Sequence, residues 1–508
     1  MIEVERKFSA TASFVLPDLA REGWVVAPPR TFDLRATYFD TADLRLARAG
    51  ITLRRRLGGK DAGWHLKLPA GADRDEIARP PGRAGAVPSS LSDLVLARTR
   101  GQALVPVAQI DTTRTVTVIC ADDGTPLLEV ADDLVQGRRF TSSPPAEGAA
   151  ALAWREVEVE LLSPGQDKAL AKVGKVLGRA GAGPASSGSK LARTLGSVPA
   201  APASADDGFA DDGSAASAVR DYLAQQVQAL LAADPYVRQG QGEAVHAMRV
   251  ASRRLRSALR TFAPLLDGAR VEGLGAELAW LAGALGEVRD RDVLSMRMLA
   301  RLDELPADLA TEAARSGLVQ DELGASGRTA HLALLRALRG QRFLALLERL
   351  EQLACAPPLL PEADAPAGEV LPELAASAWR RLRKRAEKAL ASGEDEHLHD
   401  ARKSAKQARY AAEALAPALG RPARRLAKRA TAVQTLLGDH QDAVIAGALL
   451  RRLADDPRHG FVYGALWALE QGHARACAQE FTLAWPDVDE AARRSLRELR
   501  TGASRSRR

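Results

Sequence analysis

Hydrophobic and polar residues alternate along several short segments in the first 200 residues of the chain. The segments with the clearest alternation are Met1–Phe8, Ile51–Leu57, Gly63–Leu68, Thr113–Ile119 and Trp154–Leu161. Because successive side chains of a β-strand point to opposite faces, this pattern predicts strands with one apolar and one polar face. We therefore predict a strand-rich domain over residues 1–198, with short helices near Leu91–Thr99 and Asp167–Gly178.

The pattern changes after this domain. Residues 199–217 are rich in Ala, Ser, Asp and Gly without any period, which predicts a flexible linker. Residues 218–500 show apolar positions at helical spacing, with a break at Pro357–Pro372, and residues 501–508 are predicted to form a disordered basic tail. The predicted fold class is multidomain α+β, with an antiparallel β domain followed by an all-α domain.

Composition narrows the class of protein. A chain of 508 residues exceeds the size of one hydrophobic core, and its formal net charge of +7 favours polyanions as partners. The cysteines Cys120, Cys355 and Cys477 match no metal-binding spacing and fit a reducing compartment. The sequence shows neither a signal peptide nor an apolar run of about 18 residues, so we expect a cytoplasmic protein that does not enter a membrane.

Charged residues gather on one parity of the predicted strands. The residues that share a charged face are Glu3, Glu5 and Lys7 in the first segment, Arg54 and Arg56 in the second, Lys67 in the third, and Glu156, Glu158 and Glu160 in the last. If these faces converge, the cations would bind a phosphate chain and the carboxylates a divalent metal. A sheet with its charged face in water has the same pattern, so parity alone leaves both interpretations open.

In order and in spacing, these segments resemble the CYTH superfamily of triphosphate tunnel metalloenzymes. The motifs that carry the resemblance are Glu3–Lys7, Tyr38–Leu44, Leu53–Arg56, Trp64–Pro69, Arg155–Leu161 and Ser189–Lys190. The resemblance implies an antiparallel β-barrel with a charged tunnel, which acts on triphosphates with Mg²⁺ or Mn²⁺ as the cofactor.

The same resemblance assigns roles to residues of the tunnel. The phosphate-binding residues that it implies are Lys7, Arg54, Arg56, Lys67, Arg114 and Lys190. The metal-binding residues that it implies are Glu3, Glu5, Asp133, Glu158 and Glu160, with Asp132 as an alternative to Asp133. The implied catalytic residues are Glu3, Glu5 and Lys7, and the further candidates for the tunnel wall are Glu76 and Glu129.

The helical half of the chain contains an internal repeat. The motif His246–Arg249 recurs 153 residues later as His399–Arg402, and Leu285–Glu287 recurs as Leu437–Asp439. Two motifs that recur in the same order at nearly the same distance predict a duplicated helical unit.

Each repeat carries a row of basic residues at helical spacing. The first row is His246, Arg249, Arg253, Arg256 and Arg260, and the second row is His399, Arg402, Lys406 and Arg409. Spacings of three and four place each row on one helix face, which fits an extended polyanion, although a solvated basic face is the alternative. We expect Asp290 and Asp442 to orient these rows through ion pairs. The basic helices hold few aromatic residues that could stack bases, so we favour polyphosphate over nucleic acid.

On these motifs, the half from about residue 214 to 500 resembles the CHAD domain. The resemblance implies two helical bundles related by pseudo-two-fold symmetry and binding of inorganic polyphosphate by the two basic rows. The prediction for the whole chain is metal-dependent hydrolysis of inorganic triphosphate in the barrel, with polyphosphate binding in the helical domain and a cytoplasmic location at polyphosphate granules. Two alternatives stay open: an adenylate cyclase of the CYTH type, and a polyphosphate-granule binding protein with weak catalysis.

Overall fold

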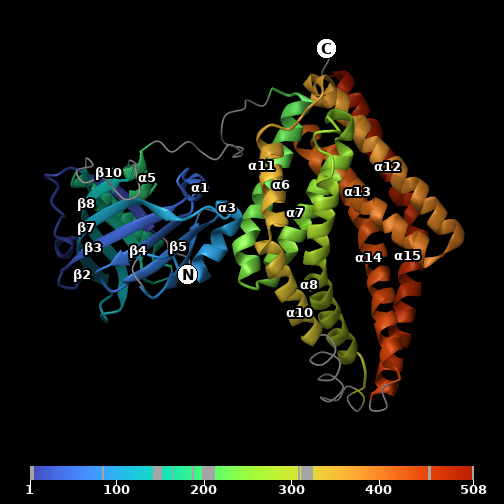
Figure 1. The fold of residues 1–508 in the computed structure, drawn as a ribbon, viewed down its shortest axis with the longest axis horizontal. Coiled ribbons are helices and arrows are strands. Elements are labelled where there is room, and N and C mark those ends of the chain that lie inside the picture. The colour runs from blue at the N-terminus through green and yellow to red at the C-terminus, as the bar shows by residue number, and fades with distance from the viewer. Residues whose placement is uncertain are drawn as a thin grey trace. The chain divides into compact units, whose positions relative to one another are not determined.

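The computed structural model describes residues 5–71, 73–82, 85–140, 151–163, 165–185, 188–196, 212–306, 309, 324–455 and 459–505. The chain divides into two compact units, Met1–Ala201 and Pro202–Arg508, which are called unit 1 and unit 2 below. Figure 1 shows strands in unit 1 and helices in unit 2, as the sequence pattern predicts. Within the described residues, no helix has both the length and the apolarity that a membrane span requires.

Unit 1 is built on one antiparallel sheet. Its strands are β1 (Glu5–Ala10), β2 (Val25–Val26), β3 (Arg30–Asp40), β4 (Thr52–Leu57), β5 (Gly63–Ala70), β6 (Asp73–Arg79), β7 (Val105–Cys120), β8 (Pro126–Arg139), β9 (Leu152–Leu161) and β10 (Gly183–Pro184). The strands follow the order β10-β1-β9-β8-β7-β3-β4-β5-β6, and β2 pairs with β7. No pairing among the described strands joins β6 to β10, so the predicted barrel is an open sheet that curves around a cavity.

Short helices complete unit 1. They are η1 (Leu19–Glu22), α1 (Arg45–Arg48), α2 (Ser89–Ser92), η2 (Asp93–Val95), α3 (Leu96–Thr99), α4 (Asp167–Arg179) and α5 (Lys190–Leu195). The apolar face of the sheet packs on α4, because Val157 and Val159 of β9 share a buried cluster with Leu170 and Val173. Each such side chain stabilises the fold by about 1.5–3 kcal/mol when it is fully buried. The opposite face of β9 is therefore turned toward the cavity.

The hairpin between β4 and β5 is tightly constrained. Gly58 follows β4 with a φ of +80°, a backbone conformation that favours glycine. A Cβ atom at this position would collide with the backbone carbonyl oxygen of Asp33 on β3. The turn therefore needs glycine both for its conformation and for its contact with the neighbouring strand.

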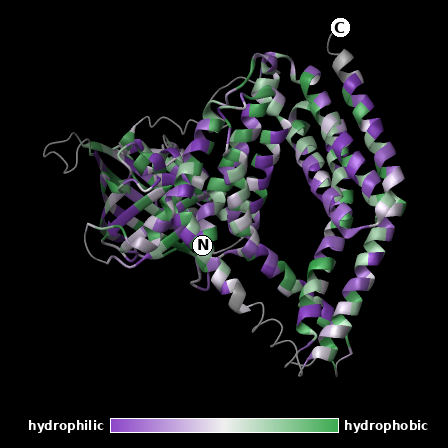
Figure 2. Ribbon diagram, turned by 45° about the vertical axis from the view of Figure 1, so that its right-hand side comes forward, coloured by the Kyte–Doolittle hydropathy of each residue, from purple (hydrophilic) through white to green (hydrophobic). Residues whose placement is uncertain are grey.

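Helices are the regular elements of unit 2 in its described residues, and two isolated β-bridges join Ser214 to Pro366 and Leu266 to Leu359. Its elements are α6 (Ala215–Arg238), α7 (Gly242–Thr261), η3 (Ala263–Leu265), α8 (Leu274–Asp303), α10 (Ala325–Arg339), α11 (Gln341–Cys355), η5 (Pro361–Asp364), α12 (Ala367–Ser392), α13 (Asp395–Leu419), α14 (Arg421–Leu453) and α15 (Gly460–Arg505). Figure 2 shows hydrophilic and hydrophobic residues mixed along these helices, as expected when each helix buries only one face.

Three boundaries in unit 2 differ from the sequence-based expectation. Helix α6 begins at Ala215, inside the predicted linker, where the side chain of Ser214 caps the helix by accepting from the Ser217 backbone N–H. Helix α12 begins at Ala367 and contains Pro372, which removes one backbone hydrogen bond in the second turn of the helix. Helix α15 continues to Arg505, into the segment predicted as a tail.

The two repeats occupy matching helices. The basic rows lie on α7 and α13, and the two Leu-Gly-acid motifs lie on α8 and α14. Helix α7 packs between α6 and α8, as α13 packs between α12 and α14, and α7 also contacts α13. The structure thus places the duplicated motifs at equivalent positions of two helical groups.

A buried ion cluster links α8 to α15. The Glu470 carboxylate has no exposed surface and accepts from Arg297 at 2.9 and 2.5 Å and from Arg301 at 3.0 Å. Two guanidinium groups on one buried carboxylate satisfy its charge, so this cluster holds the ends of the two long helices together.

Candidate functional site

One cavity in unit 1 collects side chains from most strands of the sheet, and its volume is about 590 Å³. The sequence-predicted residues that line it are Glu5, Lys7, Arg54, Arg56, Lys67, Arg114, Glu158, Glu160 and Lys190. Asp133 is fully buried next to this wall, and Glu3 lies outside the described residues. The charged faces of the strands converge, so the alternative of a sheet face open to water does not hold for these residues.

Three glutamates lie side by side on neighbouring strands, and we call them the acidic row. Glu5 of β1 is in register with Glu160 of β9, which is in register with Glu129 of β8, and all three line the cavity. Directly opposite residues have Cβ atoms about 4.5–5.5 Å apart, a spacing at which like charges destabilise the sheet. Carboxylate oxygens are the ligands that Mg²⁺ and Mn²⁺ prefer, and a bound cation would offset this repulsion. The acidic row therefore fits a divalent metal.

A second group of carboxylates is occupied by a cation of the protein itself. Oxygen atoms of Asp133, Glu156 and Glu158 lie within 4.8 Å of one another. The Nζ atom of Lys190, the first residue of α5, lies 2.9, 2.6 and 2.8 Å from these three carboxylates in that order. Burial lowers the pKa of Lys190, but the three carboxylates outweigh it and raise the pKa above its ordinary value. Because this lysine offsets their charge, the three carboxylates are a weaker candidate for a metal than the acidic row.

Arg114 of β7 is fixed by two of the same carboxylates. Its Nε and Nη2 atoms donate to Asp133 at 2.8 and 2.7 Å, and Nη2 also donates to Glu158 at 2.5 Å. Burial raises the pKa of Glu158, yet Lys190, Lys7 and Arg114 together bring it well below its usual value. Asp133 reaches the cavity only through Arg114 and Lys190, and in this structure it orients these two cations.

Lys7 connects the acidic row with the second carboxylate group. Its Nζ lies 3.0 Å from Glu5 and 3.0 Å from Glu158. Burial lowers the pKa of Lys7, but Glu158 and Glu5 raise it further, so the ammonium stays charged. The opening strand thus supplies both an acid and a base to one wall of the cavity.

The facing wall carries two arginines of β4. Arg54 donates to the Tyr38 hydroxyl at 3.5 Å, and Arg56 forms an ion pair with Asp61 of the β4–β5 loop. Burial and the nearby Arg54 both lower the pKa of Arg56. Burial raises the pKa of Tyr38, but Arg54 and Arg56 reverse this effect and lower it. Such shifts indicate an excess of positive charge, which a phosphate group would reduce.

Several residues of the cavity received no role from the sequence. They are Arg30, Tyr38, Lys60, Asp61 and Arg74. Alternation along β6 places Arg74 and Glu76 on the same face of the strand. The sequence evidence for this face is weak, because the segment is short and carries charged residues on both faces. Lys60 and Asp61 lie in a loop, where no periodicity exists to show which way they point.

The Tyr38–Leu44 motif has a structural task in addition to its place near the cavity. The buried Asp40 carboxylate accepts from the backbone N–H groups of Thr41, Leu46 and Ala47 at 2.7, 2.8 and 2.8 Å. Burial raises the pKa of Asp40, and these hydrogen bonds offset part of that rise. The motif fixes the start of α1 and the end of β3, and so the position of Tyr38.

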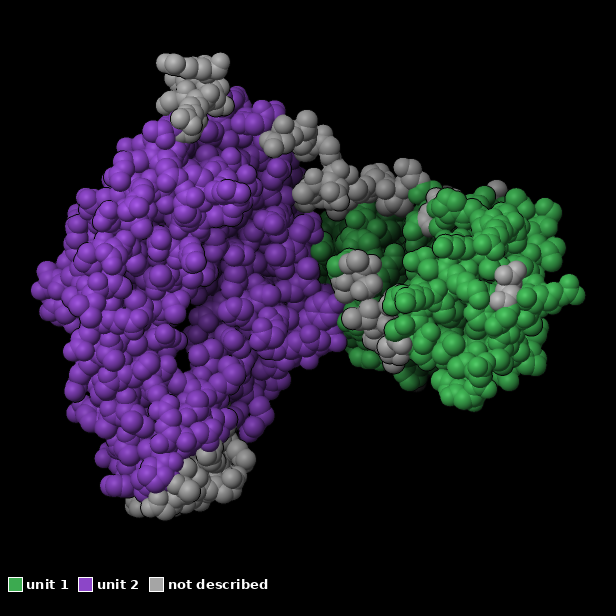
Figure 3. All heavy atoms as spheres, turned by 180° about the vertical axis from the view of Figure 1, so that it is seen from behind, with its two compact units in different colours: residues 1–201 green, residues 202–508 purple. Residues whose placement is uncertain are grey.

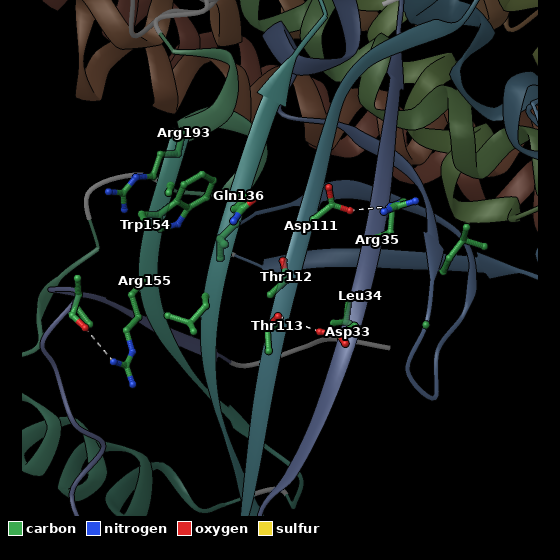
Figure 4. A pocket seen from close by; sticks show the side chains of 17 residues that line it. Asp33, Leu34, Arg35, Asp111, Thr112, Thr113, Gln136, Trp154, Arg155 and Arg193 are labelled. Atoms are coloured by element: carbon green, nitrogen blue, oxygen red, sulfur yellow. Dashed lines mark hydrogen bonds and ion pairs between the residues drawn. The ribbon is translucent and has the colours of Figure 1, made fainter. Parts of the chain in front are cut away.

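A second hollow, of about 990 Å³, lies among the other strand faces of unit 1. Figure 4 shows its labelled side chains, where Arg35 pairs with Asp111 at 2.8 Å and Thr113 donates to Asp33 at 2.9 Å. Because these polar groups already satisfy one another, the hollow has a weaker claim to a charged ligand than the cavity.

In unit 2, Asp290 and Asp442 each form an ion pair with one arginine of a basic row, as predicted. Arg249 donates to Asp290 at 2.7 and 3.3 Å, and Arg402 donates to Asp442 at 3.4 Å. The glycine of each motif lies against the same arginine: a Cβ added to Gly286 would be 3.4 Å from the Arg249 guanidinium. Glycine therefore lets the arginine lie close to α8, and Gly438 does the same for Arg402 on α14.

Cations from the two basic rows converge between α7 and α13. Burial, Arg253, Arg402 and Arg249 lower the pKa of Lys406 to about 6. Burial also lowers the pKa of Arg253, and neighbouring arginines add to this effect. The Nε atoms of Arg249 and Arg402 and the Nδ1 atom of His399 are buried without a hydrogen-bond partner in the described part of the chain. Together, these basic residues and unpaired polar atoms form a site that fits an anion.

The second row is shorter than the first because Glu413 ends it. Glu413 lies 3.4 Å from Arg409 and accepts from Arg254 of α7 at 2.8 Å, so it ties the two helices together. His440 lies 3.2 Å from Asp395 at the start of α13, and it does not extend the row. Figure 3 shows an opening in the surface of unit 2.

Two known domain families match the chain. The CYTH domain matches residues 1–195 and the CHAD domain matches residues 221–451. The uncharacterized protein MT2285 of Mycobacterium tuberculosis (strain CDC 1551 / Oshkosh) is 37% identical over 519 residues, which cover 97% of this chain and 98% of that protein. The chain belongs to the family of CYTH–CHAD proteins. The uncharacterized protein Rv2226 of strain ATCC 25618 / H37Rv has the same identity and coverage.

Solved structures resemble parts of this CYTH–CHAD protein. PptA from Streptomyces chartreusis is 28% identical with a TM-score of 0.46, and the match covers 54% of this chain and 99% of PptA. The CHAD domain from the plant Ricinus communis is 26% identical with a TM-score of 0.42, over 56% of this chain and 92% of that domain. Members of the CYTH superfamily act on phosphoanhydrides and depend on a metal, so family membership supports a role in phosphate chemistry.

Proposed function

We propose that unit 1 hydrolyses inorganic triphosphate with Mg²⁺ or Mn²⁺ as the cofactor. The observation that carries this proposal is the charge of the cavity lining, which has nine Lys and Arg residues but six Asp and Glu residues. The excess of cations suits a small, highly charged anion. The lining has two aromatic rings, Phe32 and Tyr38, and the Tyr38 hydroxyl already accepts from Arg54, which supports a substrate without a base over ATP.

The acidic row fits the metal. Glu5, Glu129 and Glu160 would hold it, and Glu3 would add a ligand from the same strand parity. When bound, the cation would neutralise phosphate oxygens and make the phosphorus more electrophilic. Glu158 was also predicted as a ligand, and we propose that it instead positions Lys7, Lys190 and Arg114.

The protein's cations bind and orient the phosphate chain. Arg114 and Lys190 are rigidly placed by buried carboxylates, so they can stabilise charge on the phosphate that leaves without reorganising. Arg54, Arg56 and Lys67 face them from β4 and β5 and hold the rest of the chain. Discrimination between substrate and product then depends on the acidic row, because uniform binding by cations alone would retain both equally.

Phosphate release by the purified full-length protein tests this proposal. Inorganic triphosphate, ATP and thiamine triphosphate are supplied in turn with Mg²⁺ or Mn²⁺, and triphosphate should be cleaved fastest. Production of cyclic AMP from ATP would establish the adenylate cyclase alternative instead. Absence of turnover with every substrate would favour the alternative of a binding protein with weak catalysis.

We also propose that the basic rows of unit 2 bind inorganic polyphosphate and bring the protein to polyphosphate granules in the cytoplasm. The convergence of cations between α7 and α13 supports this, because their mutual repulsion is relieved by an extended anion. Reversal of Arg253 and Lys406 to Glu should weaken polyphosphate binding at least tenfold. Lys384→Glu, at an exposed position of α12, is the matched control and should leave affinity unchanged. Equal affinity of the double variant would move the binding surface elsewhere.

A further inference from the structure

His65 occupies a buried position that the proposed function does not use. It lies on β5 with 6% of its surface exposed, two residues before Lys67 and in register with Arg54 of β4. Its Nδ1 atom lies 2.5 Å from a carboxylate oxygen of Glu76. Its Nε2 atom lies 2.8 Å from the backbone carbonyl oxygen of Asp61.

Both ring nitrogens of His65 therefore face hydrogen-bond acceptors. A backbone carbonyl can only accept, so Nε2 must carry a proton. In the neutral imidazole, Nδ1 would then direct a lone pair at the Glu76 carboxylate, which is repulsive at this distance. One additional proton must lie between the imidazole and the carboxylate.

The surroundings of Glu76 decide which group holds that proton. The second oxygen of Glu76 lies 3.1 Å from the Lys67 ammonium, and Arg54 interacts electrostatically with this carboxylate as well. Cations on its other side favour the ionised form of Glu76. The contacts of the ring therefore match an N–H donor at each nitrogen.

His65 touches two groups that each hold a cation of the cavity. Glu76 holds Lys67, and Asp61, whose carbonyl His65 binds, uses its own carboxylate to hold Arg56. Asp61 lies in the loop after Gly58 and is half exposed, so the hydrogen bond from His65 is a buried anchor for this loop.

We propose that His65 is a doubly protonated positioning residue, which orients Lys67 through Glu76 and Arg56 through Asp61 for binding of the phosphate chain. This inference rests on the proposed function in unit 1. It also assigns Glu76 to the cations, so this carboxylate is not a metal ligand. If His65 lost its charge, Glu76 would be left partly unneutralised inside the cavity and would repel the substrate.

The protonation state can be measured directly. Nitrogen NMR on full-length protein with ¹⁵N-labelled histidine, with His65 assigned by the His65→Gln variant, should show protons on both ring nitrogens at pH 7.5. A neutral ring at this pH would overturn the proposal. This measurement does not depend on any substrate, so its result is distinct from failure of the triphosphatase activity.

A pair of variants tests the positioning role. His65→Gln should raise KM for inorganic triphosphate about tenfold or more, while kcat changes less. Adding Glu76→Gln removes the carboxylate that links His65 to Lys67, so the effects of the two substitutions on KM should be non-additive, with the double variant close to Glu76→Gln alone. Independent effects of the two substitutions, which multiply in the KM of the double variant, would refute the proposal. His473→Gln on α15 is the control, and thermal melting confirms that each variant is folded. If the unaltered protein shows no turnover, calorimetric binding of triphosphate to the same set replaces KM.

Discussion

Binding of polyphosphate to unit 2 should be coupled to uptake of a proton by Lys406. In the free protein, burial and the surrounding arginines lower the pKa of Lys406 to about 6, from an ordinary value of 10.5. Above pH 6 the side chain is therefore mostly neutral. A polyanion beside it favours the ammonium and raises the pKa again. The complex then binds one more proton than its free components.

The sign and size of the effect follow from this linkage. Because the bound state holds more protons, affinity falls as pH rises between about 6 and 10.5. Full uptake of one proton changes the dissociation constant about tenfold per pH unit, or about 1.4 kcal/mol. Between pH 6.5 and 8.5 the upper limit is thus about a hundredfold weakening, and a partial shift of the pKa would give proportionally less.

Calorimetry at a single pH detects the proton directly. Titration of a polyphosphate of defined length into the full-length protein is repeated at pH 7.5 in two buffers with different heats of ionisation. The difference in apparent enthalpy gives the number of protons taken up, which should approach one. Varying the pH should then reproduce the predicted slope of affinity.

Lys406→Arg is the matched control, because arginine stays charged in proteins and restores the residue type found at the equivalent position of the first row. This variant should bind polyphosphate with less proton uptake and with an affinity that depends less on pH. Titration of the polyphosphate end groups contributes equally for both proteins, so it cancels in the comparison. Equal proton uptake by Lys406→Arg and the unaltered protein would refute the reasoning. Lys406→Met, without a charge at any pH, should bind more weakly than either.

Three further substitutions test other parts of the structure. Glu160→Gln removes the middle carboxylate of the acidic row, so kcat with triphosphate should fall at least a hundredfold, and unchanged kcat would exclude Glu160 as a ligand. Gly58→Ala should destabilise unit 1 by about 2 kcal/mol or more, because its positive φ and the collision with β3 both oppose a Cβ atom; an unshifted melting temperature would contradict this. Glu470→Gln leaves two partly buried guanidinium groups without their counter-charge and should cost about 3–5 kcal/mol in denaturant unfolding, whereas Glu304→Gln at a more exposed position should cost little.

The sequence predicted five of the strands of unit 1, β1, β4, β5, β7 and β9, and for all of these except β7 it predicted the face that is turned to the cavity. This was possible because Val157 and Val159 alternate with glutamates, and such a period survives in any sheet that buries one face. The duplicated rows of unit 2 were also visible, since their spacing of three and four follows the helix itself. Both signals are local and need no knowledge of partners.

The pairing of charges in unit 1 could not be predicted. Lys190 lies about 30 residues after Glu158 in the chain, and nothing in the sequence indicates that one ammonium would contact three carboxylates. The contacts of His65 depend on the path of a loop, and Asp61 binds through its backbone as well as its side chain. Which acids are left for a metal is decided only after such internal pairs are known. For Glu129, the strand register supplied the evidence, because it places this residue opposite Glu160.

The position of β1 has a consequence for the order in which the chain can fold. This first strand lies between the last two strands, β9 and β10, so no partner for its edges exists until about 150 further residues have been synthesised. Lys190 follows still later, and before it arrives Asp133 and Glu158 lack a counter-charge on α5. We expect a nascent chain that stops short of α5 to expose β1 and to mispair. Because the two ends of unit 1 pair with each other, the cavity is a late product of folding, formed only when the whole unit has left the ribosome.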